Sequence, residues 1–237
     1  MTIRLVVFDV SGTTVHDGGG VVRRTMREVL SGAGLELREG ALEGVAGLPK
    51  RTAIRTLLEG HGRDELLTRV DSLHTDFAAR MRRWYRDDPA VREVAGTTAT
   101  FRALREADIR VALATGFSRD VLDVILARLD WVGSNSPVDA TIASDEVKRG
   151  RPWPDAIDAL RKGAGELPSA EVAKVGDTPA DLQEGTMARC GLVVGVLTGG
   201  HSREALEEQP HDQIIASVAE LPALLERLRL LPAHATT

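Results

Sequence analysis

The chain has 237 residues, enough for one large domain or for a core domain with a smaller inserted one. Its composition, 43% hydrophobic and 27% charged, is typical of an ordinary soluble globular protein. The net charge of −5 excludes a broadly basic surface, so we expect neither nucleic acid nor an anionic membrane as a partner.

The first predicted element is a strand over residues 3–7, an apolar, β-rich run that ends at Phe8 and Asp9. Residues 17–89 then contain no convincing strand, and their apolar residues recur at helical spacing. We interpret this stretch as an insertion of about four helices, the last of them over residues 64–85. Glycines 18–20 and Pro89 punctuate its two ends.

From about residue 91 onward, helices and strands are predicted to alternate. Helices are expected over 97–107 and 118–129 and from residues 154, 179, 202 and 220, and strands over 109–114, 141–143, 172–175, 192–197 and 213–216. This alternation predicts an α/β fold, a doubly wound parallel sheet with helices on both faces. We expect a core domain formed by residues 1–16 and 90–237 and a helical cap domain formed by residues 17–89.

Two features predict where the protein is found. The longest apolar run, residues 192–197, is far shorter than the ~18–20 residues that span a bilayer, and the N-terminus lacks the apolar stretch of a signal peptide. The single cysteine, Cys190, excludes an internal disulfide and lies in no motif, so we expect it to be structural. We predict a cytoplasmic protein whose oligomeric state the sequence does not reveal.

Polar residues follow two of the predicted strands. Asp9 stands at the tip of a buried strand, where a carboxylate can attack phosphorus, although an Asx-turn or helix N-cap would explain it equally well. Thr115 and Gly116 follow the strand over 109–114 and can bind a phosphate oxygen, or can simply form the turn into the next helix.

Two further segments carry charged groups near strand ends. Prolines at 152 and 154 stiffen the loop that holds Arg151, which could face a phosphate or Asp9, or could be one of many solvated arginines. Asp177 and Asp181 flank a helix start at four-residue spacing, so both carboxylates can face one Mg²⁺ ion. Helix N-capping by Asp177 is compatible with that role.

Taken together, the segments Phe8–Thr14, Val111–Gly116, Gly150–Pro154 and Val175–Asp181 resemble the haloacid-dehalogenase superfamily, and within it the phosphonatase-like hydrolases with a helical cap. The resemblance covers nearly the whole chain. It implies a Mg²⁺-dependent enzyme with the following site: Asp9 as nucleophile, Thr115 and Arg151 on the phosphoryl group, Asp9, Asp177 and the Ser11 carbonyl on Mg²⁺, and Asp181 in support of the metal. Further substrate contacts are expected from Gly12, Thr13, Gly116 and Phe117.

Ser11 departs from most phosphatases of that superfamily, which carry a second Asp there as general acid and base. A serine cannot do this near neutral pH. Phosphonoacetaldehyde hydrolases also have a small residue at this place, because a substrate imine on a cap lysine can supply the function. Gly47-Leu48-Pro49-Lys50 resembles their lysine segment, so Lys50 is a candidate for a Schiff base.

Other positions leave the role of Lys50 open. Ala53 and Phe117 stand where phosphonoacetaldehyde hydrolases have His and Tyr, so ordinary substrate contact by Lys50 is an alternative. The leading hypothesis is a hydrolase for a small phosphonate or organophosphate, acting through an aspartyl-phosphate on Asp9. The alternatives are a phosphomonoesterase for a sugar phosphate or related metabolite and, from a different class, a non-catalytic binding protein on the same scaffold.

Overall fold

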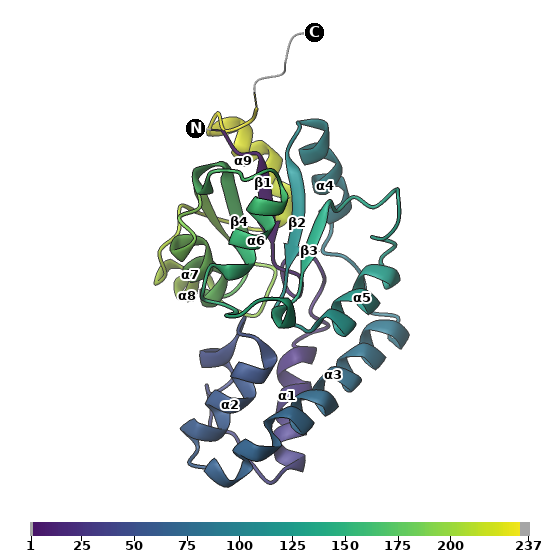
Figure 1. The fold of residues 1–237 in the computed structure, drawn as a ribbon, viewed down its shortest axis with the longest axis vertical. Coiled ribbons are helices and arrows are strands. Elements are labelled where there is room, and N and C mark those ends of the chain that lie inside the picture. Colours follow the sequence, from purple (N-terminus) through teal and green to yellow (C-terminus); the bar gives the residue numbers. More distant parts are fainter. Residues whose placement is uncertain (1, 233–237) are drawn as a thin grey trace.

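Six parallel strands form one sheet at the centre of the computed structural model, which describes residues 2–232 (Figure 1). The strands are β1 (Leu5–Phe8), β2 (Arg110–Ala114), β3 (Ala140–Ile142), β4 (Val172–Gly176), β5 (Leu192–Val196) and β6 (Gln213–Ile215). Their order is β3-β2-β1-β4-β5-β6, so β1 lies in the middle, between β2 and β4. The chain reverses its direction of winding at β1, and parallel sheets bind ligands at such a reversal.

Strand β1 shows why the sheet is covered on both faces. Val6 and Phe8 point into one apolar cluster and Leu5 and Val7 into another, because side chains alternate along a strand. The first face is covered by α4 (Thr97–Glu106), α5 (Arg119–Arg128) and α9 (Leu221–Arg227). The second is covered by α6 (Asp155–Gly163), α7 (Pro179–Met187) and α8 (Arg203–Glu207). The predicted doubly wound fold is confirmed.

The segment between β1 and α4 is helical, as expected. It contains α1 (Val21–Gly32), α2 (Lys50–Gly60) and α3 (Val70–Asp87), with short 3-10 helices at Glu43–Val45 and Asp64–Arg69. About four helices were predicted; the structure has three α-helices and two short 3-10 helices in this segment. The expected helix over 64–85 begins as a 3-10 helix, a difference that apolar spacing cannot reveal, since i, i+3 neighbours suit both helix types.

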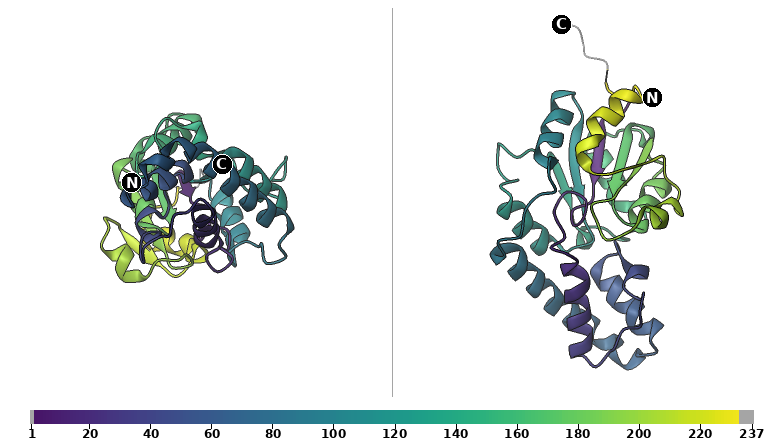
Figure 2. Two further views of the ribbon diagram at one scale, coloured as in Figure 1. Left: turned by 90° about the horizontal axis from the view of Figure 1, so that it is seen from below. Right: turned by 180° about the vertical axis from the view of Figure 1, so that it is seen from behind.

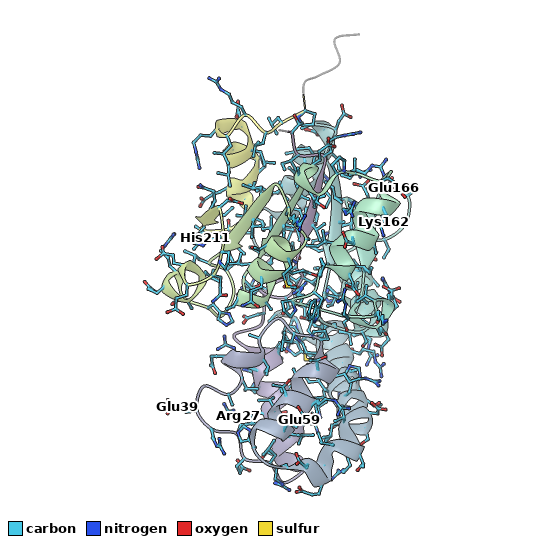
Figure 3. All side chains as sticks on the ribbon, turned by 60° about the vertical axis from the view of Figure 1, so that its left-hand side comes forward. Arg27, Glu39, Glu59, Lys162, Glu166 and His211 are labelled. Carbon is cyan, nitrogen blue, oxygen red and sulfur yellow. The ribbon has the colours of Figure 1, made fainter. Side chains whose placement is uncertain are left out.

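These helices form a body beyond one edge of the sheet (Figures 1 and 2). Helices α1 and α2 are amphipathic: Met26 and Ile54 are buried, whereas the charged side chains of Arg27 and Glu59 lie on the outside, as does Glu39 in the segment between the two helices (Figure 3). Helix α3 also packs against α5 of the core. We propose that the boundary between cap and core lies near residues 17 and 89. None of the described helices has the length and apolar character needed to cross a membrane.

Candidate active site

Asp9 is fixed directly after the central strand. Its backbone N–H donates to the Val175 carbonyl at 2.9 Å, and its own carbonyl accepts from the Thr14 hydroxyl at 2.9 Å. Strand register pairs Phe8 with Leu113 on one side and with Val175 on the other. The residues that follow β2 and β4 therefore emerge beside Asp9, which brings Thr115 and Asp177 to the same edge of the sheet.

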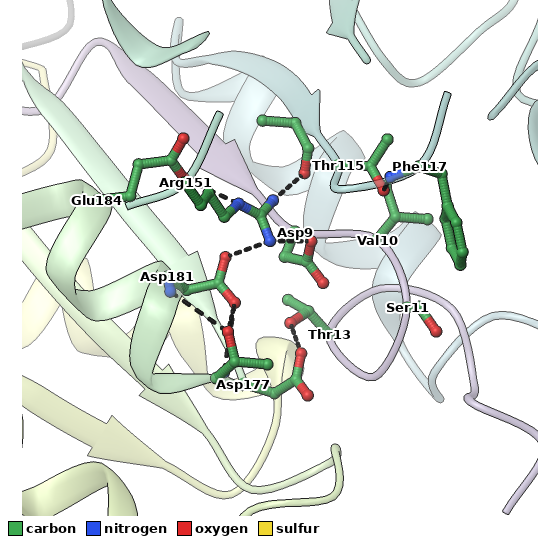
Figure 4. Close-up of polar contacts among 12 residues, drawn as sticks. Asp9, Val10, Ser11, Thr13, Thr115, Phe117, Arg151, Asp177, Asp181 and Glu184 are labelled. Atoms are coloured by element: carbon green, nitrogen blue, oxygen red, sulfur yellow. Dashed lines mark hydrogen bonds and ion pairs between the residues drawn. The ribbon is translucent and has the colours of Figure 1, made fainter. Parts of the chain in front are cut away.

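Arg151 connects the buried acidic groups of the site (Figure 4). Its Nη1 lies 2.7 Å from Asp9 Oδ1 and 2.9 Å from Asp181 Oδ1, and its Nε lies 3.1 Å from Glu184 Oε2. Its Nη2 also donates to the Ala114 carbonyl. Only 4% of this side chain is exposed, and five planar N–H donors are needed to make such contacts at once.

Lys174 and Glu184 belong to the same network and were missed by sequence reasoning. The Lys174 ammonium is fully buried, 2.9 Å from Asp181 Oδ1 and 2.8 Å from Glu184 Oε2. A lysine in the middle of a strand predicted to be buried was the available signal, because lysine is almost never fully buried without partners. Glu184 stands three residues after Asp181 and therefore on the same face of α7.

Thr13 fixes the Asp177 carboxylate: its hydroxyl donates to Asp177 Oδ1 at 2.7 Å. Two glycines let the backbone approach this carboxylate. A Cβ at Gly12, where φ is +93°, would lie 2.5 Å from Asp177 Oδ2, and one at Gly199 would lie 1.8 Å from it. These positions require glycine, because any larger residue would displace the carboxylate.

Asp181 lies in the first turn of α7, but the helix is capped by a different residue than expected. The Thr178 side chain accepts from the Asp181 N–H, and the Thr178 hydroxyl donates to Asp181 Oδ2 at 2.6 Å. This is a reciprocal capping box, so the N-cap is Thr178. The suggestion that Asp177 caps the helix was wrong, and Asp177 remains free to face the cavity.

The protonation of the three aspartates differs. Burial raises the pKa of Asp9 despite the nearby Arg151, and burial together with Asp9 and Asp181 raises the pKa of Asp177 well above its usual value. Burial opposes ionisation of Asp181 as well, but Arg151 and Lys174 hold its pKa below the usual value. The positive charges near Asp9 and Asp177 are therefore too few to favour their ionised carboxylates, whereas Arg151 and Lys174 balance the negative charge of Asp181.

This charge balance matches a divalent cation. Among the described residues, one carboxylate oxygen each from Asp9, Asp177 and Asp181 lies within 4.8 Å of the others. Within the core, the buried cluster has two more negative than positive side chains, since four carboxylates face two cations: Asp9, Asp177, Asp181 and Glu184 against Arg151 and Lys174. The cap adds the buried Lys50, whose pKa is lowered. A divalent ion would offset that excess, and carboxylates are the ligands that hard cations prefer.

Lys50 reaches the site from the cap. It is the first residue of α2, and its backbone N–H donates to the Gly116 carbonyl of the core at 3.2 Å. Its buried Nζ donates to the Leu48 carbonyl at 3.1 Å and lies 5.3 Å from the centre of the Phe117 ring. Burial lowers the pKa of Lys50 to about 8, with Asp9 opposing the shift. An appreciable fraction of its amine is therefore neutral near physiological pH.

The loop that carries Lys50 packs closely on the core. A Cβ at Gly47 would lie 2.2 Å from the Thr178 hydroxyl, and one at Gly116 would lie 2.7 Å from the Leu48 carbonyl. A Cβ at Gly150 would likewise overlap Pro49. Glycines on both sides of this contact allow the backbone of the cap loop to lie directly on the backbone of the core. The cap is therefore closed over the cavity in this structure.

One cavity joins core and cap. The core residues that line it include Asp9, Ser11, Thr115, Gly116, Phe117, Arg151, Asp177, Thr178, Gly200 and His201, and the cap residue Lys50 also lines it. Gly12 and Thr13, expected as substrate contacts, instead lie beneath it against Asp177. Tyr85, which no sequence pattern indicated, donates to the Ser11 Oγ at 3.2 Å from the end of α3.

A family model described as haloacid dehalogenase-like hydrolase matches residues 3–189, which include Asp9, Lys50, Thr115, Arg151 and the acidic residues of this site. The chain belongs to that family. This hydrolase is 27% identical over 266 residues to the phosphonoacetaldehyde hydrolase of Bacteroides fragilis, and the match covers 94% of this chain and 96% of that relative. It is 26% identical to the enzyme of the same name from Bacillus cereus, over 93% of this chain and 85% of the relative.

Solved structures confirm the fold of this haloacid dehalogenase-like hydrolase. A phosphonoacetaldehyde hydrolase-like protein from Oleispira antarctica superposes with a TM-score of 0.82 at 20% identity, covering 96% of this chain and 93% of that one. A β-phosphoglucomutase from Clostridium difficile superposes with a TM-score of 0.76 at 16% identity, covering 96% and 98%. Members of this family generally use a divalent metal, which agrees with the buried acidic cluster.

Two residues considered from the sequence lie outside the cavity of the hydrolase. Lys148, three residues before Arg151 in the sequence, has an exposed side chain and does not line the cavity. Cys190 packs at the edge of two apolar clusters. Burial raises the pKa of its thiol to about 12, so the thiol stays protonated near neutral pH.

Proposed function

We propose that this hydrolase cleaves the carbon–phosphorus bond of a small phosphonate that carries a carbonyl group. The observation that carries the proposal is the shared cavity of Lys50 and Asp9, an amine with a lowered pKa and a carboxylate at a strand end. The names of the two curated relatives support the same substrate class. Ser11, which offers no acid–base group near neutral pH, fits a reaction that does not depend on one.

The metal is proposed to be Mg²⁺, held by Asp9, Asp177 and the backbone carbonyl of Ser11, with Asp181 in support. When bound, it would neutralise the charge that develops on the transferred phosphoryl group. Asp181 is better suited to positioning than to direct ligation, because its Oδ1 already contacts Arg151 and Lys174.

The phosphono group is proposed to bind between the motif residues. Arg151 provides positive charge and Thr115 a hydroxyl, with the Gly116 backbone close by. In this structure the guanidinium of Arg151 contacts Asp9 at 2.7 Å, so it lies where it can contact a phosphoryl group on that carboxylate. The charge of Arg151 also opposes the effect of burial on the pKa of Asp9 and so favours the ionised, nucleophilic form.

Lys50 is proposed to form an imine with the substrate carbonyl and release one water. Asp9 then attacks phosphorus, the carbon–phosphorus bond breaks, and its electron pair moves into the enamine, with the iminium as electron sink. Protonation of the enamine carbon and hydrolysis of the imine return the amine and a carbonyl product. A second water hydrolyses the aspartyl-phosphate to inorganic phosphate, so the complete cycle consumes one water.

The alternative, a phosphomonoesterase, predicts a different fate for Lys50. Treatment with phosphonoacetaldehyde and borohydride should reduce the imine and modify Lys50 alone, as read by peptide mass spectrometry, with loss of activity. Lys50→Arg keeps the charge but forms no imine and should lose carbon–phosphorus cleavage. Lys148→Arg is the matched control at an exposed lysine. An unmodified Lys50 with intact activity contradicts the proposal and favours the phosphomonoesterase.

The nucleophile is tested separately. Asp9→Asn should reduce turnover of any phosphonate or phosphate by at least about 10³-fold, because removing a nucleophile removes the covalent route. Retained activity in that variant would refute the role of Asp9. Absence of Mg²⁺-dependent turnover across a panel of phosphates and phosphonates would favour the non-catalytic binding protein instead.

A further inference from the structure

The cavity has two ends of different chemistry. The core end is polar and holds the groups assigned above to the phosphono group and the metal. The cap end is lined by apolar side chains from α1, the following loop and α2: Val22, Met26, Leu42, Val45 and Ala53. A substrate that fills the cavity presents its phosphono group to the first end and the rest of its structure to the second.

These five residues, which we call the apolar wall, are packed into the cap. Met26, Leu42, Val45 and Ala53 are each at most 6% exposed and belong to the large apolar cluster of the molecule. Such side chains offer no hydrogen bonds, and close packing limits their rearrangement around a polar ligand. A substrate group with many hydroxyls would lose its water there without gaining partners.

Two charged side chains that line the cavity beside the apolar residues are engaged within the protein. Arg23 Nη1 lies 3.2 Å from Glu43 Oε1, and its Nη2 donates to the Gly200 carbonyl at 2.9 Å. The Asp17 carboxylate accepts from the backbone N–H groups of Gly19 at 2.9 Å and Gly20 at 3.1 Å. These contacts occupy Arg23, so it is not free to bind a second anionic group on the substrate.

The imidazole of His201 also lines the cavity, with both ring nitrogens buried and without a hydrogen-bond partner among the described residues. Of the described lysines and arginines that line this cavity, Arg23 and Arg151 have carboxylate partners, whereas the Lys50 amine contacts a backbone carbonyl. This amine is used by the reaction itself, so it does not select a carboxylate or a second phosphate.

Ala53 lines the cavity beside Lys50. It stands three residues after Lys50 on α2, so both side chains lie on the face that lines the cavity. Because alanine is small, it occupies little of the cavity that it shares with the amine. The neighbouring lining from α1 and the following loop is apolar, so a chain on the carbonyl carbon of the substrate could extend along it.

We propose, building on the carbon–phosphorus cleavage inferred above, that the substrates are 2-oxoalkyl phosphonates whose carbonyl carbon carries an apolar chain. The reaction would convert such a compound and one water into inorganic phosphate and a methyl ketone. The chain contacts Met26, Val45 and Ala53, which makes these the residues that select the substrate. Phosphonoacetaldehyde, with a hydrogen in place of the chain, would be a poorer substrate.

Binding tests the apolar wall without any turnover. Methyl-, propyl- and pentylphosphonate lack a carbonyl and cannot form an imine, so calorimetry in the presence of Mg²⁺ measures the cavity alone. We expect Kd to fall roughly fourfold for each added methylene, the factor that corresponds to ~0.8 kcal/mol per buried CH₂. 3-Hydroxypropylphosphonate should bind more weakly than propylphosphonate. A Kd that does not change with chain length, or that rises with it, would overturn the proposal.

Turnover separates this inference from the proposed function. Phosphate release should show a higher kcat/KM for 2-oxopentylphosphonate than for phosphonoacetaldehyde, and a lower one for 3-phosphonopyruvate, which carries a carboxylate on the carbonyl carbon. If phosphonoacetaldehyde is cleaved and longer chains are slower, this inference fails alone. If no phosphonate is cleaved while the affinity for alkylphosphonates still rises with chain length, the proposed carbon–phosphorus cleavage is wrong but the inferred binding of an apolar chain is supported.

A pair of variants links the effect to its position. Ala53→Leu fills the wall and should abolish the gain in affinity with chain length. Thr56→Leu adds the same side chain to the exposed face of the same helix, outside the cavity, and should leave the chain-length series unchanged. An unaltered series in Ala53→Leu would show that the chain binds elsewhere.

Discussion

The phenol of Tyr85, at the end of α3, donates a hydrogen bond to Ser11 Oγ, two residues after Asp9, at 3.2 Å. Burial raises the pKa of Tyr85, with its hydrogen bond to Ser11 opposing the shift, so the phenol stays protonated and can act as the donor of this bond. Ser11 therefore accepts from Tyr85 and keeps its own proton for the cavity that it lines. A cap residue thus orients a hydroxyl of the core.

Removing the phenol hydroxyl should affect turnover more than binding. We expect Tyr85→Phe to lower kcat about 3- to 10-fold, the loss of one neutral hydrogen bond, with little change in KM. Steady-state kinetics and a cycle with Ser11→Ala test this. If Tyr85 acts through Ser11, the kcat of the double variant will be no lower than that of Ser11→Ala. If instead the fold-losses in kcat of the two single variants multiply in the double variant, Tyr85 does not act through Ser11.

Arg151 should not tolerate a conservative exchange. Arg151→Lys keeps the charge but cannot contact Asp9, Asp181 and Glu184 together, as the guanidinium does. We expect at least about 10²-fold lower kcat/KM and about 3–5 kcal/mol lower stability, because buried carboxylates lose their partner. Kinetics and urea unfolding measure both. Lys148→Arg, at an exposed position, should change neither quantity.

Asp177→Asn should stabilise the metal-free protein while abolishing its response to Mg²⁺. The pKa of Asp177 is raised in the folded protein, so its ionised form costs stability at every pH above that raised value. Asparagine removes the charge and still accepts from Thr13, so we expect a gain on the order of 1 kcal/mol. Thermal unfolding with and without Mg²⁺ checks this. A destabilised variant whose Tm still rises with Mg²⁺ would contradict the metal assignment.

The pH dependence of carbon–phosphorus cleavage should follow the Lys50 amine. Because the pKa of Lys50 is lowered to about 8, the reactive neutral form declines as pH falls below 8. We expect kcat/KM to fall toward tenfold per pH unit below 8 and to level off above it. The rate of borohydride trapping at Lys50 should follow the same curve. A profile that is flat from pH 6 to 8 would exclude imine formation as a controlling step.

The strands and motif ends could be predicted from sequence because local rules dominate there. A buried run that ends at Asp9 and an alternation of helices and strands suffice to bring Thr115 and Asp177 to one edge of the sheet. Lys174 and Glu184 were not predicted, since their role depends on which charges surround them after folding. The partnership of Tyr85 with Ser11 spans 74 residues and leaves no local pattern.

The glycines between cap and core carry a consequence for how the protein handles its own reactive groups. Lys50 shares the cavity with Asp9 because its loop rests directly on the Gly116 backbone, with its N–H on the Gly116 carbonyl at 3.2 Å. If that loop were to move away, water would reach the amine, its pKa would return toward the ordinary lysine value, and it would be protonated near neutral pH. The contact that excludes solvent therefore also lowers the pKa of the amine, so an open cap would leave Lys50 unreactive toward unrelated aldehydes.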